Sequence, residues 1–92
     1  MDDKKLERSL NSIGKACFVN HYELFRDKSC ADVLFVVDFL VKNEQYTNAG
    51  AQIRVSHAKA IFNAGRQVDA LKIIVQSQRL PQESVDKARQ FF

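Results

Sequence analysis

The apolar residues of this chain recur at intervals of three and four along almost all of its 92 residues. That period lines them up on one side of a helix, whereas a half-buried strand would alternate them in steps of two. Few residues interrupt a helical path, since the chain has three glycines and one proline, Pro81. The pattern predicts an all-α fold of about five helices, and a chain this short forms a single small domain.

The predicted helices form three parts, and glycine and proline mark their limits. Gly14 is a weak point where the first helix kinks or contacts a neighbour closely. Gly65 is expected to end a helix in the left-handed conformation, and Pro81 fits the first turn of the last helix. The parts are an N-terminal helix over 4–26, a two-helix unit over 30–64 and a C-terminal helical hairpin over 67–92.

The segment 30–42, CADVLFVVDFLVK, permits two interpretations. Its four valines and two phenylalanines favour a buried strand by propensity. A helical projection collects its valines and Leu40 on one broad face, so we predict a helix that Ser29 caps. This projection leaves Phe35 and Phe39 on the polar side, where they pack under a neighbouring helix or form a contact surface for a partner.

Each predicted helix has an apolar face that should enter the core. The second helix of the 30–64 unit, which we place at 49–63 with Thr47 or Asn48 as its N-cap, has the core face Ala51, Val55, Ala58, Ile61 and Phe62. The expected core residues are Leu6, Leu10, Ile13, Cys17, Phe18, Tyr22, Leu24, Phe25, Val33, Val36, Val37, Leu40, Val41, Ala51, Val55, Ala58, Ile61, Phe62, Val68, Leu71, Ile74, Val75, Val85, Ala88 and Phe92.

The net charge of +3 is unevenly distributed. Residues 1–46 carry seven Lys and Arg against eight acids, a net charge of −1, whereas residues 47–92 carry seven against three, a net charge of +4. An excess of positive charge in one half indicates an anionic partner there, although a soluble surface with uneven charge is the plainer interpretation.

A buried helix, a short polar turn and a second helix with basic residues make the layout of a helix-turn-helix. The 49–63 helix would present a polar face, and Asn and Gln suit hydrogen bonds to adenine edges. The expected base contacts are Asn48, Gln52, Ser56 and Lys59, and the expected phosphate contacts are Arg54, Arg66 and Lys72.

The stretch AQIRVSHAKAIFNAGR, within residues 49–66, resembles the recognition helix of sigma-factor region 4 and related regulators. Arg54, Ser56, Ala58 and Lys59 stand where that family has its Arg–x–Ser–x–Ala–Arg/Lys pattern. The resemblance implies a helix seated in the DNA major groove. Two residues depart from the pattern: His57 replaces the usual basic residue, and bulky Tyr46 lies in the turn.

A second stretch, AIFNAGRQVDALKIIVQSQRLPQ, is similar to the middle of a tetratricopeptide repeat. Gly65, Ala70 and Pro81 approach the spacing of that repeat, which implies two helices joined at a tight glycine turn with a small alanine where they cross. Only one unit is present and about three are needed for a stable array, so we interpret it as hairpin packing.

Several aromatic residues are difficult to bury in a domain of this size. We predict a partner or dimer surface made by Phe35, Phe39, Phe91 and Phe92, and a homodimer would suit a DNA-binding protein that reads two half-sites. The leading hypothesis is a transcriptional regulator that binds DNA. The alternative is a helical protein–protein interaction module, an adaptor or inhibitor, without a role on nucleic acid.

Other classes of function have weak signals. Cys17 and His21 have a spacing that can share a metal, and Cys30 and His57 could complete four ligands, but no metal motif supports them, so we predict neither metal nor cofactor. Phosphate-binding glycine loops and paired carboxylates are missing, so we predict that the chain is not an enzyme. The composition indicates a cytoplasmic protein without a membrane segment.

Overall fold

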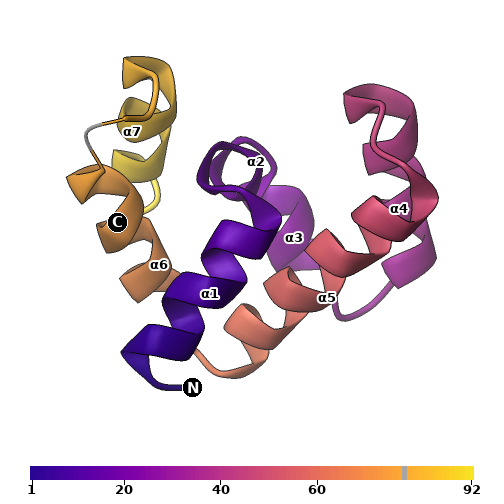
Figure 1. The fold of residues 1–92 in the computed structure, drawn as a ribbon, viewed down its shortest axis with the longest axis horizontal. Coiled ribbons are helices and arrows are strands. Elements are labelled where there is room, and N and C mark those ends of the chain that lie inside the picture. The colour runs from indigo at the N-terminus through magenta and orange to yellow at the C-terminus, as the bar shows by residue number, and fades with distance from the viewer. Residues whose placement is uncertain (78) are drawn as a thin grey trace.

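The computed structural model describes residues 1–77 and 79–92, which form seven helices and no strand (Figure 1). This confirms the all-α prediction and the single compact domain, but the helices are shorter and more numerous than the five predicted. They are α1 Asp3–Ile13, α2 Lys15–Asn20, α3 Tyr22–Lys28, α4 Val33–Glu44, α5 Asn48–Asn63, α6 Gln67–Gln76 and α7 Gln82–Arg89.

The predicted N-terminal helix over 4–26 is wrong as one element, because it is broken twice. Gly14 has φ 91° and ψ 125°, outside the helical region, and separates α1 from α2. His21, with φ −116° and ψ 26°, separates α2 from α3. The apolar residues keep a helical spacing in the sequence across both breaks, which is why the pattern predicted one helix.

The ambiguous segment is helical, because α4 covers most of it. Its N-cap is Asp32, whose carboxylate accepts a hydrogen bond from the Phe35 backbone N–H at 3.1 Å. The prediction of Ser29 as the cap is wrong. Ser29 ends α3, where its buried hydroxyl donates to the Phe25 carbonyl.

Three residues, 45–47, connect α4 to α5. Gln45 ends α4 in the left-handed conformation (φ 57°), and the Thr47 hydroxyl accepts from the Gly50 N–H at 3.0 Å as the predicted N-cap. At the other end of α5, Gly65 has φ 69°, and the Arg66 N–H bonds to the Ile61 carbonyl at 3.1 Å. The helix end predicted at Gly65 is therefore confirmed.

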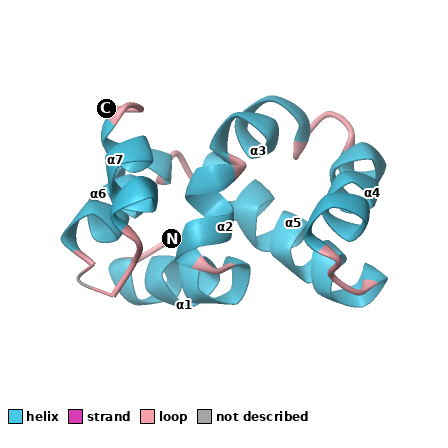
Figure 2. Ribbon diagram, turned by 90° about the horizontal axis from the view of Figure 1, so that it is seen from above, coloured by secondary structure: helices cyan, strands magenta, loops and turns pink. Residues whose placement is uncertain are grey.

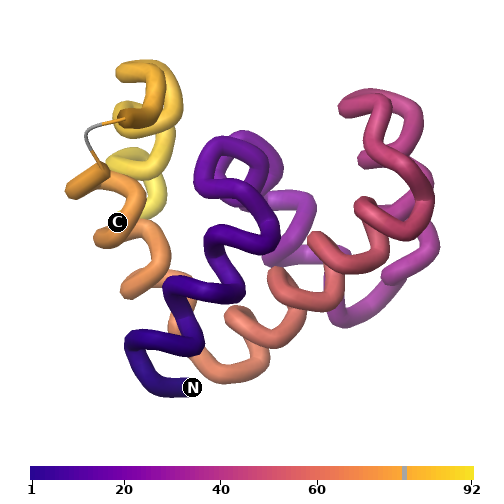
Figure 3. The backbone as a smooth tube through the Cα atoms, in the orientation of Figure 1, coloured from indigo at the N-terminus to yellow at the C-terminus, as the bar shows by residue number. Residues whose placement is uncertain are grey.

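The seven helices pack around one core, and α1 packs across α5 (Figures 1 and 3). Helices α6 and α7 lie on one side of α1, and α3 and α4 lie on the other, as the view from above shows (Figure 2). The aromatic part of the core is formed by Phe18, whose ring packs against Tyr22, Phe25 and Phe62 at centroid distances between 5.7 and 6.2 Å.

Most of the predicted core residues are buried, with three corrections. Val33 and Val68 are exposed, the latter to 42%, and both lie at the start of their helices, α4 and α6. Phe92 is 57% exposed, beyond the end of α7. Leu24, Val41, Phe62 and Val75 are partly buried against the core.

The break at Gly14 provides the first test of this architecture. Gly14→Ala should lower the free energy of unfolding by about 1–3 kcal/mol, because an L side chain is strained at this φ whatever space surrounds it. Urea denaturation measures the change. Asn11→Ala, exposed on α1, is the control and should change stability by less than about 0.5 kcal/mol; equal effects of the two substitutions would contradict the break.

Candidate functional site

The face of α5 predicted to read DNA bases is only partly accessible. Asn48, Gln52 and Ser56 are exposed, whereas Lys59 is half-buried. Asn48 and Gln52 also bond to each other, with the Gln52 Nε2 donating to the Asn48 Oδ1 at 2.6 Å. Toward the middle of α5 the exposed surface includes Ile53, which is 53% exposed.

Arg54, predicted to contact phosphate, is turned inward toward α1. Its Nη1 donates to the carbonyls of Ser12 (3.5 Å) and Ile13, the last residues of α1. The guanidinium carbon lies 4.0 Å from the centroid of the Tyr46 ring. A cation at the C-terminal end of a helix satisfies carbonyls that have no partner within the helix. Arg54 therefore links α5, α1 and the α4–α5 turn.

Arg66 is also bound within the molecule. Its Nε donates to Asp69 at 2.8 Å, and its Nη2 donates to Asp3 at 2.5 Å, so it ties the start of α6 to the start of α1. Lys87 donates to the Asn20 carbonyl at 2.8 Å. Lys72 is exposed on α6. Thus three of the seven cations in the positive half of the chain are used in holding helices together.

Removing Arg54 should destabilise the fold. Arg54→Ala should lower the free energy of unfolding by about 1.5–3 kcal/mol, the usual range for a hydrogen bond to a charged group. Arg54→Lys should recover part of the loss, since an ammonium lacks the planar fork that contacts two carbonyls and an aromatic ring. Urea denaturation measures both, with Lys72→Ala as the exposed control. A loss no larger than that of the control would contradict the linking role.

The α4–α5 turn is fixed by a second contact, between Tyr46 and Cys17 of α2. Burial, together with the hydrogen bond to Cys17, raises the pKa of Tyr46 to about 12. Burial likewise raises the pKa of the Cys17 thiol, while Tyr46 and Arg54 lower it to a lesser degree. The raised pKa values keep both groups neutral where the turn meets α2.

This coupling predicts a loss of stability at high pH. Tyr46 keeps its proton to about pH 12 in the folded chain but ionises near its ordinary value of 10.0 once unfolded. The stabilisation should be complete below pH 10 and decrease as the pH rises toward 12. The free energy of unfolding should fall less steeply over this range in Tyr46→Phe than in the wild type. Equal slopes would contradict the assignment.

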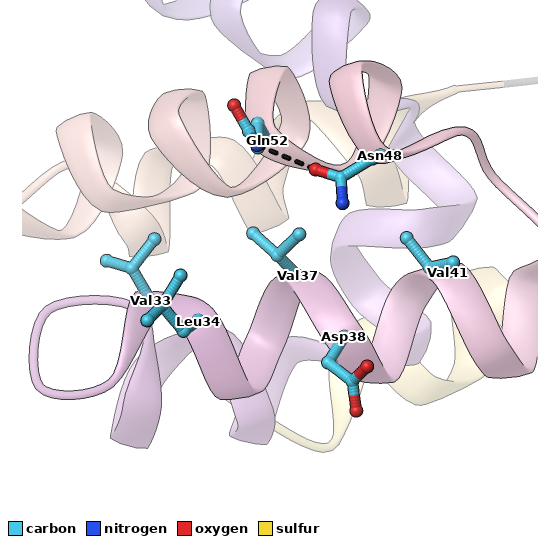
Figure 4. Close-up of a pocket in the computed structure, with 7 residues that line it drawn as sticks. All are labelled: Val33, Leu34, Val37, Asp38, Val41, Asn48 and Gln52. Atoms are coloured by element: carbon cyan, nitrogen blue, oxygen red, sulfur yellow. Dashed lines mark hydrogen bonds between the residues drawn. The ribbon is translucent and has the colours of Figure 1, made fainter.

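An open groove lies between α4 and the first half of α5 (Figure 4). Its volume is about 630 Å³, within the range of ligand pockets. Val37 and Val41 point from α4 toward α5, and Asn48 and Gln52 lie on the opposite side (Figure 4). The residues that line it are Val33, Leu34, Val37, Asp38, Val41, Asn48 and Gln52.

The start of α4 brings three consecutive apolar residues to the surface, and the first two, Val33 and Leu34, line this groove. Leu34 is 81% exposed, Phe35 is 50% exposed, and Val33 is also exposed. Asp38 stands on the rim and pairs with Lys42 at 3.0 Å on the outer side of α4. Apolar side chains gathered at one place and rimmed by polar groups are typical of an interaction site, whereas scattered ones are not.

The four phenylalanines predicted to form one partner surface are not brought together. Phe39 is partly buried, and its ring meets the His21 ring at 5.5 Å. Phe91 stacks on Tyr22 at 4.3 Å, so the chain just after α7 packs against the start of α3. Phe35 and Phe92 are the exposed members of the set, and they lie on α4 and after α7 respectively.

The four side chains considered as metal ligands are bound to different partners. His21 Nε2 contacts Glu44 at 2.6 Å, Cys30 donates to Asn63 at 3.2 Å, and His57 Nδ1 lies 3.2 Å from the Ser9 hydroxyl. Cys17 faces Tyr46. Within 1–77 and 79–92, no three potential ligand residues gather at one point. In the same part of the chain, no helix has the length and apolarity needed to cross a membrane.

Comparisons with known proteins add no assignment: the chain matches no protein family, no curated protein and no solved structure.

Sequence reasoning missed the groove and the inward direction of Arg54. A signal for the groove was present, because Val33, Leu34 and Phe35 are consecutive and cannot all enter the core from one helix. The direction of Arg54 carries no comparable signal, since it depends on where α1 ends in space.

Proposed function

We propose that this chain is a helical protein-binding module and that the α4–α5 groove receives a helical segment of its partner. The observation that supports this most is the exposed apolar start of α4, with Leu34 81% exposed beside a groove floored by valines. An amphipathic helix docking its apolar face into such a groove is a recurring mode of recognition. Covering this leucine would remove a large apolar surface from water, and that burial would stabilise the complex.

The distribution of cations also favours a protein partner over DNA. Affinity for DNA comes largely from contacts between Lys or Arg and phosphates. Arg54 and Arg66 are bound to carbonyls and carboxylates of this chain, and the groove itself has Asp38 on its rim. These contacts leave less positive charge beside α5 than the sequence suggested.

A selection from a library of helical peptides tests this proposal. Each peptide carries randomised apolar residues at i, i+4 and i+7, and its other positions vary equally among Lys, Glu and Gln. Most peptides that bind the wild-type chain should lose binding to Leu34→Glu and retain it with Lys72→Ala, its exposed control on α6. Circular dichroism of Leu34→Glu checks that this variant is folded. No selected peptides, or peptides indifferent to Leu34→Glu, would contradict the proposal.

A second candidate function, DNA binding through α5, is favoured by one specific observation. A three-residue turn with left-handed Gln45 joins α4 to α5, and the N-terminal half of α5 carries exposed Asn48 and Gln52. Short turns of this kind connect the two helices of a helix-turn-helix. The same helices would then present α5 to a major groove.

Fluorescence anisotropy with a random duplex of about 25 base pairs, at two salt concentrations, separates the two functions. The protein-binding proposal predicts no binding even at low salt, where non-specific contacts are strongest. Binding that weakens steeply with salt, and that Gln52→Ala with Lys59→Ala reduces, would support the DNA function and contradict our first proposal.

A further inference from the structure

We infer that the segment that fits the α4–α5 groove is a basic amphipathic helix of another protein. This inference rests on the proposed function and specifies the chemistry of the partner. It follows from three features of the groove: the spacing of its apolar row, the charge on its rim, and the polar side chain opposite.

The apolar row sets the length of the contact. Val33, Val37 and Val41 follow one another at intervals of four along α4, and eight residues of helix extend about 12 Å. That distance is a little over two helical turns. A helix lying along the row therefore contributes about three apolar side chains, at i, i+3 or i+4, and i+7.

Asp38 is the one charged residue among the seven that line the groove, whereas the chain as a whole carries a net charge of +3. One cation of α4 follows it by four residues. The cation, Lys42, pairs with Asp38 on the outside of α4, where both side chains are more than half exposed. Such exposed pairs contribute little and exchange easily, so Asp38 is able to pair with a cation of the partner.

The Gln52 side chain on the opposite side also suits a cationic partner. The Gln52 amide nitrogen donates to Asn48, which leaves the Gln52 Oε1 as an acceptor. Figure 4 shows this oxygen directed away from Asn48. Lys and Arg have only donors to offer, so an acceptor on one rim and a carboxylate on the other both match a basic helix.

The same charge argues against a second copy of this chain as the occupant. A two-fold dimer joined through this groove would bring α4 against α4 and place the Asp38 carboxylates of both copies in one interface. Like charges placed together across an interface disfavour the complex. A basic helix would instead bring cations beside the Asp38 carboxylate, which favours the complex.

The peptides selected by the wild-type chain test the inference, because their non-apolar positions were supplied equally as Lys, Glu and Gln. Lys should be enriched over Glu at positions beside the apolar stripe. Replacing those lysines by Glu in one selected peptide should weaken binding about fivefold at low salt, and less at high salt. The same peptide should lose this preference against Asp38→Asn, and Asp38→Lys should favour the Glu version.

Two matched variants complete the test. Lys42→Gln should increase the preference for the Lys peptide, since it removes the cation that pairs with Asp38, whereas Glu83→Gln on distant α7 should leave it unchanged. Groove-dependent peptides without a basic preference, or with an acidic one, would overturn the inference while the proposed function stands. Sedimentation showing a dimer that Leu34→Glu dissociates would also overturn it, because the occupant would be a second copy. Failure to select any groove-dependent peptide would overturn both.

Discussion

The contact between Arg54 and the end of α1 is the interaction on which the rest of the structure depends. α1 stops at Ile13 because Gly14 leaves the helical region, and the carbonyls exposed by that break accept hydrogen bonds from Arg54 of α5. The same guanidinium stacks on Tyr46, which reaches Cys17 of α2. One side chain thus fixes the crossing of α1 and α5 and the turn from which α4 and α5 diverge.

The groove is a consequence of that arrangement. With the turn held at Tyr46 and the C-terminal end of α4 tied by Glu44 to His21, the end of α4 beside the turn is anchored at two points. At its N-terminal end, Val33, Leu34 and Phe35 are exposed to solvent. The apolar surface that we interpret as a binding site therefore lies at the end of α4 farthest from these anchors.

Much of the fold could be predicted from the sequence, because helical periodicity survives local breaks. The apolar residues of 4–26 keep a helical spacing in the sequence across Gly14 and His21, so the core residues can be predicted even though three helices are taken for one. The helix at 30–42 was identified against its strand propensity by the position of its valines. Its N-cap was not, since Ser29 and Asp32 are both good caps and the three-dimensional path of the chain decides between them.

The candidate site was less accessible to sequence reasoning. A basic residue on a predicted helix is identical in sequence whether it faces solvent or a neighbouring helix end, and Arg54 and Arg66 both have partners more than 40 residues away. Exposed apolar residues are similarly ambiguous, because Phe39 finds His21 whereas Phe35 remains at the surface. Tertiary contacts, absent from the local pattern, decide both cases.

The central claim is that the α4–α5 groove is the binding surface, and amide chemical-shift mapping tests it most directly. Titrating the isotope-labelled chain with a selected basic peptide should shift resonances of Val33, Leu34, Val37, Val41 and Gln52, with little change in α6 and α7. Shifts centred on α6 and α7, or on Ile53 and Ser56 of α5 with the groove unaffected, would contradict the account.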